Sequence, residues 1–256
     1  MQAIRVHPAP TTAMHLDNIP IPKPSQPGEL LVRVKAITIV RDMLTWPETY
    51  SHEYVTLGSD VAGTVAEVFS SDSKFKPSDQ VFGMADIDRA AIWALFDHAR
   101  IPRPTMKGIK SRATRKQEQR VLITGAAGAV GVYLVQLAAA AAGVTVVAAT
   151  SSNARNGEFL QCLGACGVVE YGMLGCYRGT FDVIIDVVGG ELLVKCWDYV
   201  TETGMLISID SASFNFVEEH EKRGLRKSGV CALFFIVKGS ADALHYLAEL
   251  VGVGAV

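Results

Sequence analysis

Residues 121–131 read Val-Leu-Ile-Thr-Gly-Ala-Ala-Gly-Ala-Val-Gly, and no charged side chain occurs from Val121 to Ala154. The run begins as an apolar strand and enters a Gly-x-x-Gly-x-x-Gly turn. Proteins of the α/β class use such a turn, followed by a helix, to bring a pyrophosphate against bare backbone. The stretch therefore predicts a strand–turn–helix unit that binds a nucleotide cofactor. A βαβ crossover without a ligand is the alternative.

The same uncharged stretch could be taken for a membrane span, which needs about 20 consecutive apolar residues. Four glycines interrupt it, at 125, 128, 131 and 143, and no cluster of Lys and Arg follows directly. Strands that are covered on both faces also read as continuous apolar runs. We therefore expect a buried strand at 121–124, a helix over 131–142 and a second strand at 144–149.

The three glycines of a dinucleotide fingerprint have separate roles: the tight turn, close approach of the pyrophosphate, and packing of helix on strand. On that pattern the first position is Ala126, and the others are Gly128 and Gly131, with Gly125 one residue earlier. The following helix would offer free N–H groups and a positive dipole end to the phosphates. The candidate pyrophosphate-binding residues are Gly125, Ala126, Ala127, Gly128, Ala129, Val130 and Gly131.

The residues after the second strand bear on the cofactor's identity. An NAD site places Asp or Glu about 20 residues on, to bind the ribose 2′-OH. Here no acidic residue occurs between Val121 and Gly157. Hydroxyl, amide and guanidinium groups follow instead, and they suit a phosphate monoester. The candidates are Ser151, Ser152, Asn153 and Arg155. NADPH is thus favoured over NADH, although residues 151–153 could equally cap the next helix.

The rest of the second half keeps an α/β rhythm. Further strands are expected at 167–171, 181–188, 205–209 and 230–237, with helices at 191–200 and 241–251. Alternating strands and helices predict a parallel, doubly wound sheet. Ligands of such sheets bind beyond the carboxyl ends of the strands. Val188 and Gly189, and the turn at 208–211, are therefore candidate cofactor-lining residues.

The first half of the chain shows short strand patterns and turns in place of alternating strands and helices. Strands at 30–40 and 61–69, separated by Pro- and Gly-containing turns such as the one at 76–79, predict a small β-rich module. The division into domains is expected at 1–89 and 90–256, with a helix over 90–99. The connection 101–120 is basic, which leaves a nucleic-acid patch open. A solvated loop is favoured because the chain has a net charge of −2 and no aromatic residues interleave these cations.

Four motifs carry a resemblance to a known family. They are Gly58 to Val65, Phe75 to Gly83, Val121 to Gly131 and Phe181 to Gly190. The chain resembles the zinc-independent branch of the medium-chain dehydrogenase/reductase superfamily, the quinone oxidoreductase and enoyl reductase group. The resemblance implies a GroES-like β domain, a Rossmann domain, NADPH, and hydride delivery to an activated C=C bond or a quinone. It also implies that four residues surround the adenosine 2′-phosphate: Ser151, Ser152, Arg155 and Tyr171.

Zinc is argued against by the residues themselves. Zinc-binding relatives have a Cys in an early loop and a Gly-His-Glu motif. Here the loop 39–46 has neither Cys nor His, and the second motif reads Gly58-Ser59-Asp60. The five cysteines lack the Cys-x-x-Cys spacing of structural zinc sites. Odd in number and without a signal peptide, they indicate reduced thiols in a cytoplasmic protein. No residue is predicted to bind a metal.

At 256 residues the chain is shorter than a full family member. One block is missing after residues 84–89. Another is missing after Val251, where strands that complete the sheet are expected to be lost. A sheet edge exposed in this way predicts a homodimer or another cover of that edge.

The chemistry requires a hydrogen-bond or proton donor as well as the cofactor. Candidates in the early segment are Asp42, Tyr50 and Tyr54; a tyrosine hydroxyl could donate to a developing enolate. Packing at a domain edge, or a turn role for Asp42, is the alternative. Phe234 and Phe235 could face the nicotinamide or lie in the core.

The sequence thus predicts an NADPH-dependent, zinc-independent reductase of a small-molecule enone, enoyl compound or quinone, with neither nucleic acid nor membrane as partner. A redox-neutral isomerase, lyase or cyclase on the same scaffold is an alternative. So is a non-catalytic cofactor-binding protein.

Overall fold

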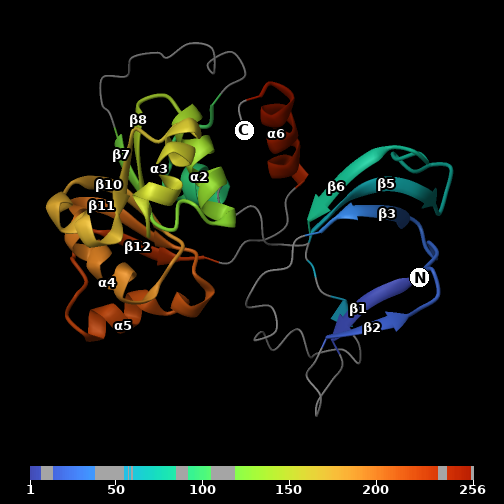
Figure 1. Cartoon of the computed structure of the whole chain (residues 1–256), viewed down its shortest axis with the longest axis horizontal. Coiled ribbons are helices and arrows are strands. Elements are labelled where there is room, and N and C mark those ends of the chain that lie inside the picture. The colour runs from blue at the N-terminus through green and yellow to red at the C-terminus, as the bar shows by residue number, and fades with distance from the viewer. Residues whose placement is uncertain are drawn as a thin grey trace. The chain divides into compact units, whose positions relative to one another are not determined.

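A computed structural model describes residues 1–6, 14–37, 55–56, 58, 60–84, 92–104, 119–235 and 241–254 of the chain. The chain divides into two units, which we call the N-terminal unit (Met1–Ile87) and the C-terminal unit (Asp88–Val256). Both are drawn in Figure 1. The domain boundary predicted between residues 89 and 90 falls outside the described ranges and stays a prediction.

Short antiparallel strands make up the described part of the N-terminal unit. They are β1 (Gln2–Val6), β2 (Met14–Asn18), β3 (Leu30–Ala36), β4 (Val55–Thr56), β5 (Asp60–Val68) and β6 (Gln80–Met84). They form two three-stranded sheets, ordered β2-β1-β4 and β3-β5-β6. The β-rich module expected of the first half is therefore confirmed, with the predicted strands at 30–40 and 61–69 found as β3 and β5.

The predicted turn at 76–79 joins β5 to β6. The N–H of Asp79 donates to the Lys76 carbonyl at 3.1 Å, and the Lys76 N–H donates to Asp79 Oδ2 at 2.8 Å. Ser78 adopts a left-handed φ of 82° within it. This local hydrogen bonding fixes the reversal without a buried contact, as turn chemistry allows.

Strands and helices alternate through the C-terminal unit. The strands are β7 (Gln119–Ile123), β8 (Val144–Thr150), β9 (Gly167–Glu170), β10 (Phe181–Asp186), β11 (Val200–Ser208) and β12 (Cys231–Phe234). The α-helices are α2 (Ala129–Ala140), α3 (Asn153–Cys162), α4 (Gly190–Tyr199), α5 (Phe216–Lys222) and α6 (Ala241–Gly252). Shorter helical segments are η3 (Trp93–His98), η4 (Tyr171–Tyr177) and η5 (Ser211–Ser213).

The six strands form one parallel sheet in the order β12-β11-β10-β7-β8-β9. This is the doubly wound order of dinucleotide-binding domains, in which the strand order reverses between β7 and β10 although all strands run parallel. The predicted α/β Rossmann fold is confirmed. The described residues hold the six strands expected between residues 121 and 237, and the expected loss of further strands after Val251 stays a prediction.

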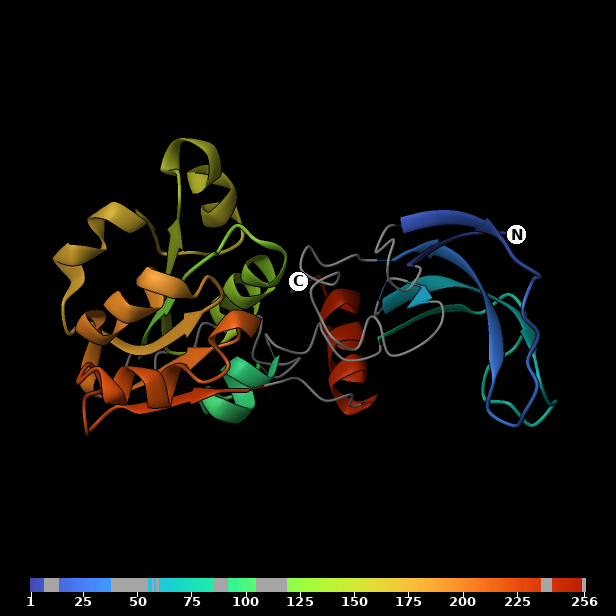
Figure 2. The ribbon, with the colours of Figure 1, turned by 90° about the horizontal axis from the view of Figure 1, so that it is seen from below.

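Alternate residues of each central strand face opposite layers. Ile123 of β7 and Ile185 of β10 belong to a core with α2 and α3, whereas Leu122 and Ile184 belong to a second core with α4 and α5. Figures 1 and 2 show these helices covering the two sides of the sheet. Burial on both faces explains why these strands read as unbroken apolar runs. No helix in the described part of the chain is long and apolar enough to cross a membrane.

The helix predicted over 90–99 is found as the six-residue π-helix η3. The Ala99 N–H accordingly donates to the carbonyl five residues back, Ala94 O, at 2.9 Å. The chain after it is tied to α6, since the Tyr246 hydroxyl donates to Pro104 O at 2.9 Å. Phe235, a candidate to face the nicotinamide, lies with its ring 4.4 Å from that of His98 and packs against the core, as does Phe234. The core interpretation of both phenylalanines therefore fits the structure.

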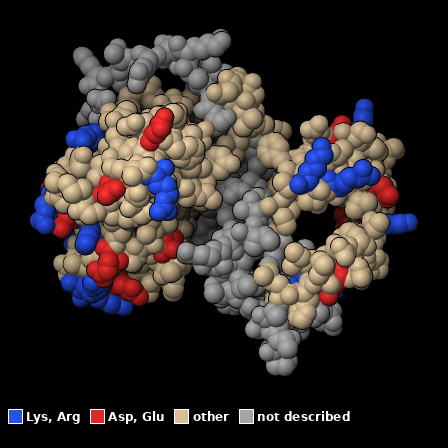
Figure 3. Space-filling view, viewed as in Figure 1, with Lys and Arg blue, Asp and Glu red and all other residues tan. Residues whose placement is uncertain are grey.

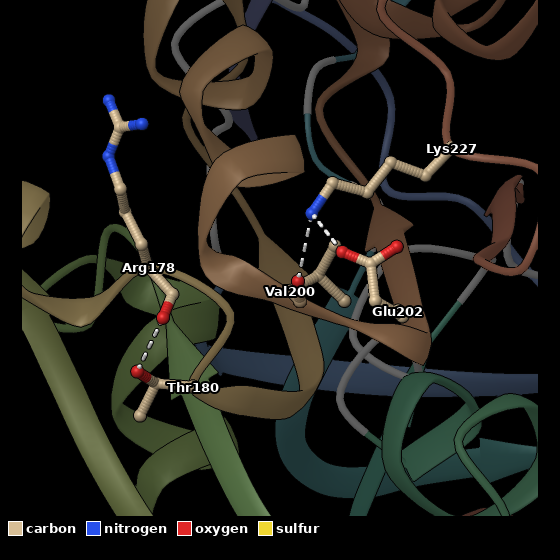
Figure 4. Close-up of polar contacts among 5 residues, drawn as sticks. All are labelled: Arg178, Thr180, Val200, Glu202 and Lys227. Atoms are coloured by element: carbon tan, nitrogen blue, oxygen red, sulfur yellow. Dashed lines mark hydrogen bonds and ion pairs between the residues drawn. The ribbon is translucent and has the colours of Figure 1, made fainter.

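Charged groups outside the sheet's carboxyl edge make surface contacts. Lys227 Nζ donates to Val200 O at 3.4 Å and lies 3.3 Å from Glu202 Oε1, which ties the 223–230 connection to the start of β11 (Figure 4). In the view of Figure 3, Lys and Arg lie next to Asp and Glu where α5 lies. Arg226 and Glu221 form an ion pair at 2.8 Å. Exposed pairs of this kind contribute little stability.

Candidate functional site: the carboxyl edge of the Rossmann sheet

Gly125 makes the tight turn after β7. Its φ is +60°, and a Cβ atom there would overlap the Val187 side chain. Ala126, placed at the first fingerprint position by sequence, is fully buried and its N–H donates to Ala149 O of β8 at 3.1 Å. The assignment of the tight-turn role to Ala126 is therefore wrong. Gly125 performs it, because a left-handed φ suits glycine.

Gly131 has the packing role that the fingerprint gives it, and the pyrophosphate role of Gly128 stays a prediction. A Cβ on Gly131 would overlap the Gly125 carbonyl and lie 2.7 Å from Ala126 Cα, so only glycine lets α2 pack this closely on the turn. Gly128 is the exposed N-cap residue of α2 and donates its N–H to Gly125 O at 2.8 Å. Its missing side chain leaves the backbone open to a ligand.

The N-terminus of α2 is bare. No side chain caps it, and its first turn has no acidic residue. The first N–H groups of an α-helix lack intrahelical partners, and the helix dipole favours an anion beside them. The backbone of residues 127–130, of which Gly128 and Ala129 are exposed, lies next to the topological switch point between β7 and β10 and therefore fits a pyrophosphate.

A buried polar network lies at the same edge of the sheet. Asp186, at the end of β10, is fully buried; its Oδ1 accepts from the Thr124 hydroxyl at 2.6 Å. Its Oδ2 accepts from the Gly189 N–H at 2.9 Å and the Ser208 hydroxyl at 3.2 Å. Burial raises the pKa of the Asp186 carboxyl, and these hydrogen bonds oppose the rise. The network joins the ends of β7, β10 and β11.

Gly189, a predicted cofactor-lining residue, is held by this network. Its φ of 72° and ψ of −162° are open essentially only to glycine. A Cβ there would overlap the Asp210 carboxylate and lie 2.7 Å from Ser213 Oγ. The neighbouring Val188 is 43% exposed. Sequence reasoning found this turn and the one at 208–211 but missed Thr124 and Asp186, whose signal is a polar residue closing an apolar strand.

Three of the residues predicted at the 2′-phosphate are free to bind it. Among the described residues, the hydroxyls of Ser151 and Ser152 and the guanidinium of Arg155 have no hydrogen-bond or ion-pair partner. Ser152 is the N-cap residue of α3, yet its side chain makes no capping hydrogen bond. The hydroxyls of these two serines therefore do not cap α3.

Asn153 makes two contacts within the fold, and its predicted part in binding the 2′-phosphate stays a prediction. Its side-chain amide donates to Val168 O at 3.2 Å, and its N–H donates to Glu170 Oε1 at 2.7 Å. Both contacts join α3 to β9, which leaves this amide committed to the fold. Glu170 was missed by sequence reasoning, although an acidic residue at the end of an apolar strand is a usable signal.

Tyr171 lies beside the glycine turn. Its hydroxyl oxygen accepts the Gly125 N–H at 3.1 Å, so η4 is tied to the end of β7. Burial raises the pKa of the Tyr171 hydroxyl, and the hydrogen bond from Gly125 opposes the rise. The contact brings the predicted 2′-phosphate residue next to the predicted pyrophosphate residues.

The predicted catalytic residues Asp42, Tyr50 and Tyr54 all lie outside the described residues. The same holds for the loop 39–46, on which the argument against zinc depends. Within the described ranges, no three His, Cys, Asp or Glu side chains are grouped to hold a metal ion. All five cysteines are free thiols; four are exposed and Cys196 is buried. Zinc independence stays a prediction.

Comparisons with known proteins agree with this architecture. Residues 26–94 match the family model "Alcohol dehydrogenase GroES-like domain". The chain is 29% identical to the "Probable zinc-binding oxidoreductase, mitochondrial" of Arthroderma benhamiae, over 96% of this chain and 84% of that protein. It is 26% identical to the quinone oxidoreductase-like protein 2 of Bos taurus, over 75% of this chain and 63% of that protein.

Solved structures share the fold. The quinone oxidoreductase of Coxiella burnetii superposes with a TM-score of 0.78 at 23% identity, covering 100% of this chain and 88% of that one. A mycobacterial structure complexed with NADPH gives 0.67 at 20% identity, covering 100% and 90%. With the GroES-like match and the doubly wound sheet, these findings define a two-domain oxidoreductase fold. The chain is therefore similar to these oxidoreductases along nearly its whole length, with a GroES-like domain match at residues 26–94.

Proposed function

We propose that the chain is an NADPH-dependent, zinc-independent oxidoreductase that reduces an activated C=C bond or a quinone. One observation carries the proposal: an uncharged glycine turn and a bare helix N-terminus lie at the switch point of the sheet. The names of the relatives support the substrate class, since one is a quinone oxidoreductase-like protein. A cytoplasmic location and a homodimer stay predictions beside it.

Each part of the site has a binding task in this proposal. The N–H groups of Ala127, Ala129 and Val130 bind the pyrophosphate, and the missing side chain of Gly128 lets it approach. Ser151, Ser152 and Arg155 bind the 2′-phosphate through hydroxyl and guanidinium donors. The turns of Gly189 and Ser208 line the nicotinamide end at the carboxyl ends of β10 and β11. The cofactor, when bound, supplies the hydride.

The buried network around Asp186 keeps these turns in register. It connects Thr124, Gly189 and Ser208, so the pyrophosphate turn and the nicotinamide end are held by one carboxylate. Fully satisfied buried polar networks rigidify the elements that they join. For the acceptor's developing negative charge, we propose the hydroxyl of Tyr50 or Tyr54, with Asp42 as the acidic group nearby in sequence.

Two substitutions test the nucleotide site. Gly128→Val places a side chain on the exposed N-cap and should weaken NADPH and NADH alike by at least ~10-fold, because the pyrophosphate can no longer approach. Arg155→Ala should weaken NADPH by ~10-fold or more and leave NADH nearly unchanged, the size expected for one hydrogen bond to a charged group. Nucleotide fluorescence titration measures both. Gly175→Ala, whose Cβ would have nothing within 4 Å, is the matched control.

Turnover is then measured as NADPH oxidation with a panel of quinones and enones. Oxidation by at least one acceptor class is the expected result. Binding of NADPH without oxidation by any acceptor would favour the redox-neutral or non-catalytic alternatives. Failure of the wild-type protein to bind either nucleotide would overturn the proposal.

A further inference from the structure

The N-terminus of α3 already holds an anion of the protein itself. Glu170, the last residue of β9, accepts the N–H of Asn153 on Oε1 at 2.7 Å. Asn153 is the first residue of α3, and the side chain of the N-cap residue Ser152 does not cap the helix. A carboxylate at this position is stabilised by the free N–H groups and by the positive end of the helix dipole.

The groups proposed for the 2′-phosphate flank the same helix end. Ser151 and Ser152 precede Asn153 directly, and Arg155 follows it within the first turn. One helical turn rises about 5.4 Å, which is less than the Debye length of ~8 Å at physiological salt. The Glu170 carboxylate and a bound 2′-phosphate would therefore repel each other with only partial screening by salt, and both favour the same N–H groups.

Nothing in the described residues neutralises Glu170 at this point. Arg155 is exposed and makes no ion pair there. The nearest fixed partner is the backbone N–H of Asn153, which is a dipole rather than a charge. A ribose 2′-hydroxyl differs from a 2′-phosphate in being uncharged and able to donate a hydrogen bond to a carboxylate.

We propose that Glu170 is a specificity-determining residue that weakens the preference for NADPH over NADH. The proposal rests on the proposed function, because it requires a nicotinamide dinucleotide at this site. Glu170 opposes the cations and hydroxyls that select the 2′-phosphate. The chain therefore binds the two cofactors with more similar affinities than Ser151, Ser152 and Arg155 alone would give.

Glu170→Gln tests this directly, since glutamine keeps an oxygen that accepts the Asn153 N–H while the negative charge is lost. The variant should bind NADPH about three- to ten-fold more tightly, the size of one partly screened charge interaction near a surface. Its affinity for NADH should stay within about two-fold of the wild type, since no charge is involved. The gain for NADPH should shrink as salt is raised. Glu158→Gln is the matched control, because Glu158 is an exposed glutamate further along α3.

The outcomes separate this inference from the function on which it rests. A wild type that binds neither nucleotide would overturn both. A wild type that binds both, with Glu170→Gln changing the two affinities equally or not at all, would overturn the role of Glu170 alone. An equal gain from Glu158→Gln would also overturn it, because the effect would then be general charge on α3.

Discussion

The two units differ in how well they remove apolar side chains from water. In the C-terminal unit, the central strands bury Leu122, Ile123, Ile184 and Ile185 completely. Among the described side chains of the N-terminal unit, only Val6 and Val65 count as buried apolar residues. Several others are well exposed there: Ile4, Met14, Leu16, Ile21, Val34, Ile37, Phe69, Phe75 and Phe82.

The difference follows from the two kinds of sheet. A parallel sheet with helices on both faces buries every residue of its central strands. The two antiparallel sheets of the N-terminal unit have three strands each, and small sheets have little apolar area to bury. The N-terminal unit is tight only locally, as at Gly63, where a Cβ would overlap Arg33 O. We infer that the nucleotide site stands on the more stable unit, which suits a site that must stay preorganised.

The largest expected effect comes from truncating the denser core. Ile185→Ala removes a fully buried side chain next to the switch point and should cost about 2–5 kcal/mol of unfolding free energy. Val65→Ala in the N-terminal unit should cost only about 1–2 kcal/mol of unfolding free energy, because the substitution removes two methyl groups from a smaller core. Urea unfolding followed by circular dichroism measures both. Equal losses, or a larger loss from Val65→Ala, would remove the contrast between the units.

Hydrophobic patterning was enough to predict the stronger unit. The apolar runs within residues 121–154 predicted two strands, and the alternation of strands and helices that continues after them predicted a parallel sheet. The turn dihedrals were not predictable in the same way: spacing placed the tight turn on Ala126, whereas the positive φ belongs to Gly125. The spacing of the glycine fingerprint does not show which residue adopts a positive φ or which one has no space for a Cβ.

Polar contacts distant in sequence were missed for a related reason. Glu170 meets Asn153 across 17 positions, and Thr124 meets Asp186 across 62. Such pairs depend on strand order and register, which exist only once the sheet has formed. The early segment with Asp42, Tyr50 and Tyr54 lies outside the described residues, so its predicted role is unchanged. The structure thus describes the predicted cofactor-binding residues, whereas the predicted catalytic residues lie outside the described ranges.

The second effect tests a buried polar contact of the C-terminal unit. Trp197 of α4 donates its Nε1–H to His220 Nδ1 of α5 at 2.8 Å, with both side chains buried. His220→Leu leaves that N–H without an acceptor and should cost about 1–3 kcal/mol. His220→Asn, which retains an acceptor, should cost less. Equal costs in denaturant unfolding would show that ring packing, rather than the hydrogen bond, decides the effect.

The same pair gives the C-terminal unit a pH dependence. Burial, and then the nearby Arg223, lowers the pKa of His220 below its ordinary value of 6.5. The unfolded chain therefore takes up a proton more readily than the folded one, so stability is full above pH ~6.5 and declines as pH falls further. We expect the wild type to be more stable than His220→Asn at about pH 7.5, and the difference in unfolding free energy to be smaller at about pH 5.5. A wild-type slope unchanged by the substitution would assign the decline to other groups.

The smallest expected effect is an increase in the stability of the C-terminal unit. Gly157 lies inside α3 with ordinary helical φ, and a Cβ there would meet only Asn153 Cβ at 4.0 Å. Gly157→Ala should stabilise the protein by about 0.5–1 kcal/mol, because the unfolded chain loses freedom that the helix does not use. Gly179 offers equal space, with nothing within 4 Å, but its φ is +57°. Gly179→Ala should therefore destabilise by about 1 kcal/mol. Thermal unfolding of the two variants isolates the effect of φ, because neither new Cβ meets a close neighbour. If both substitutions changed stability in the same direction, φ would not be what decides the effect.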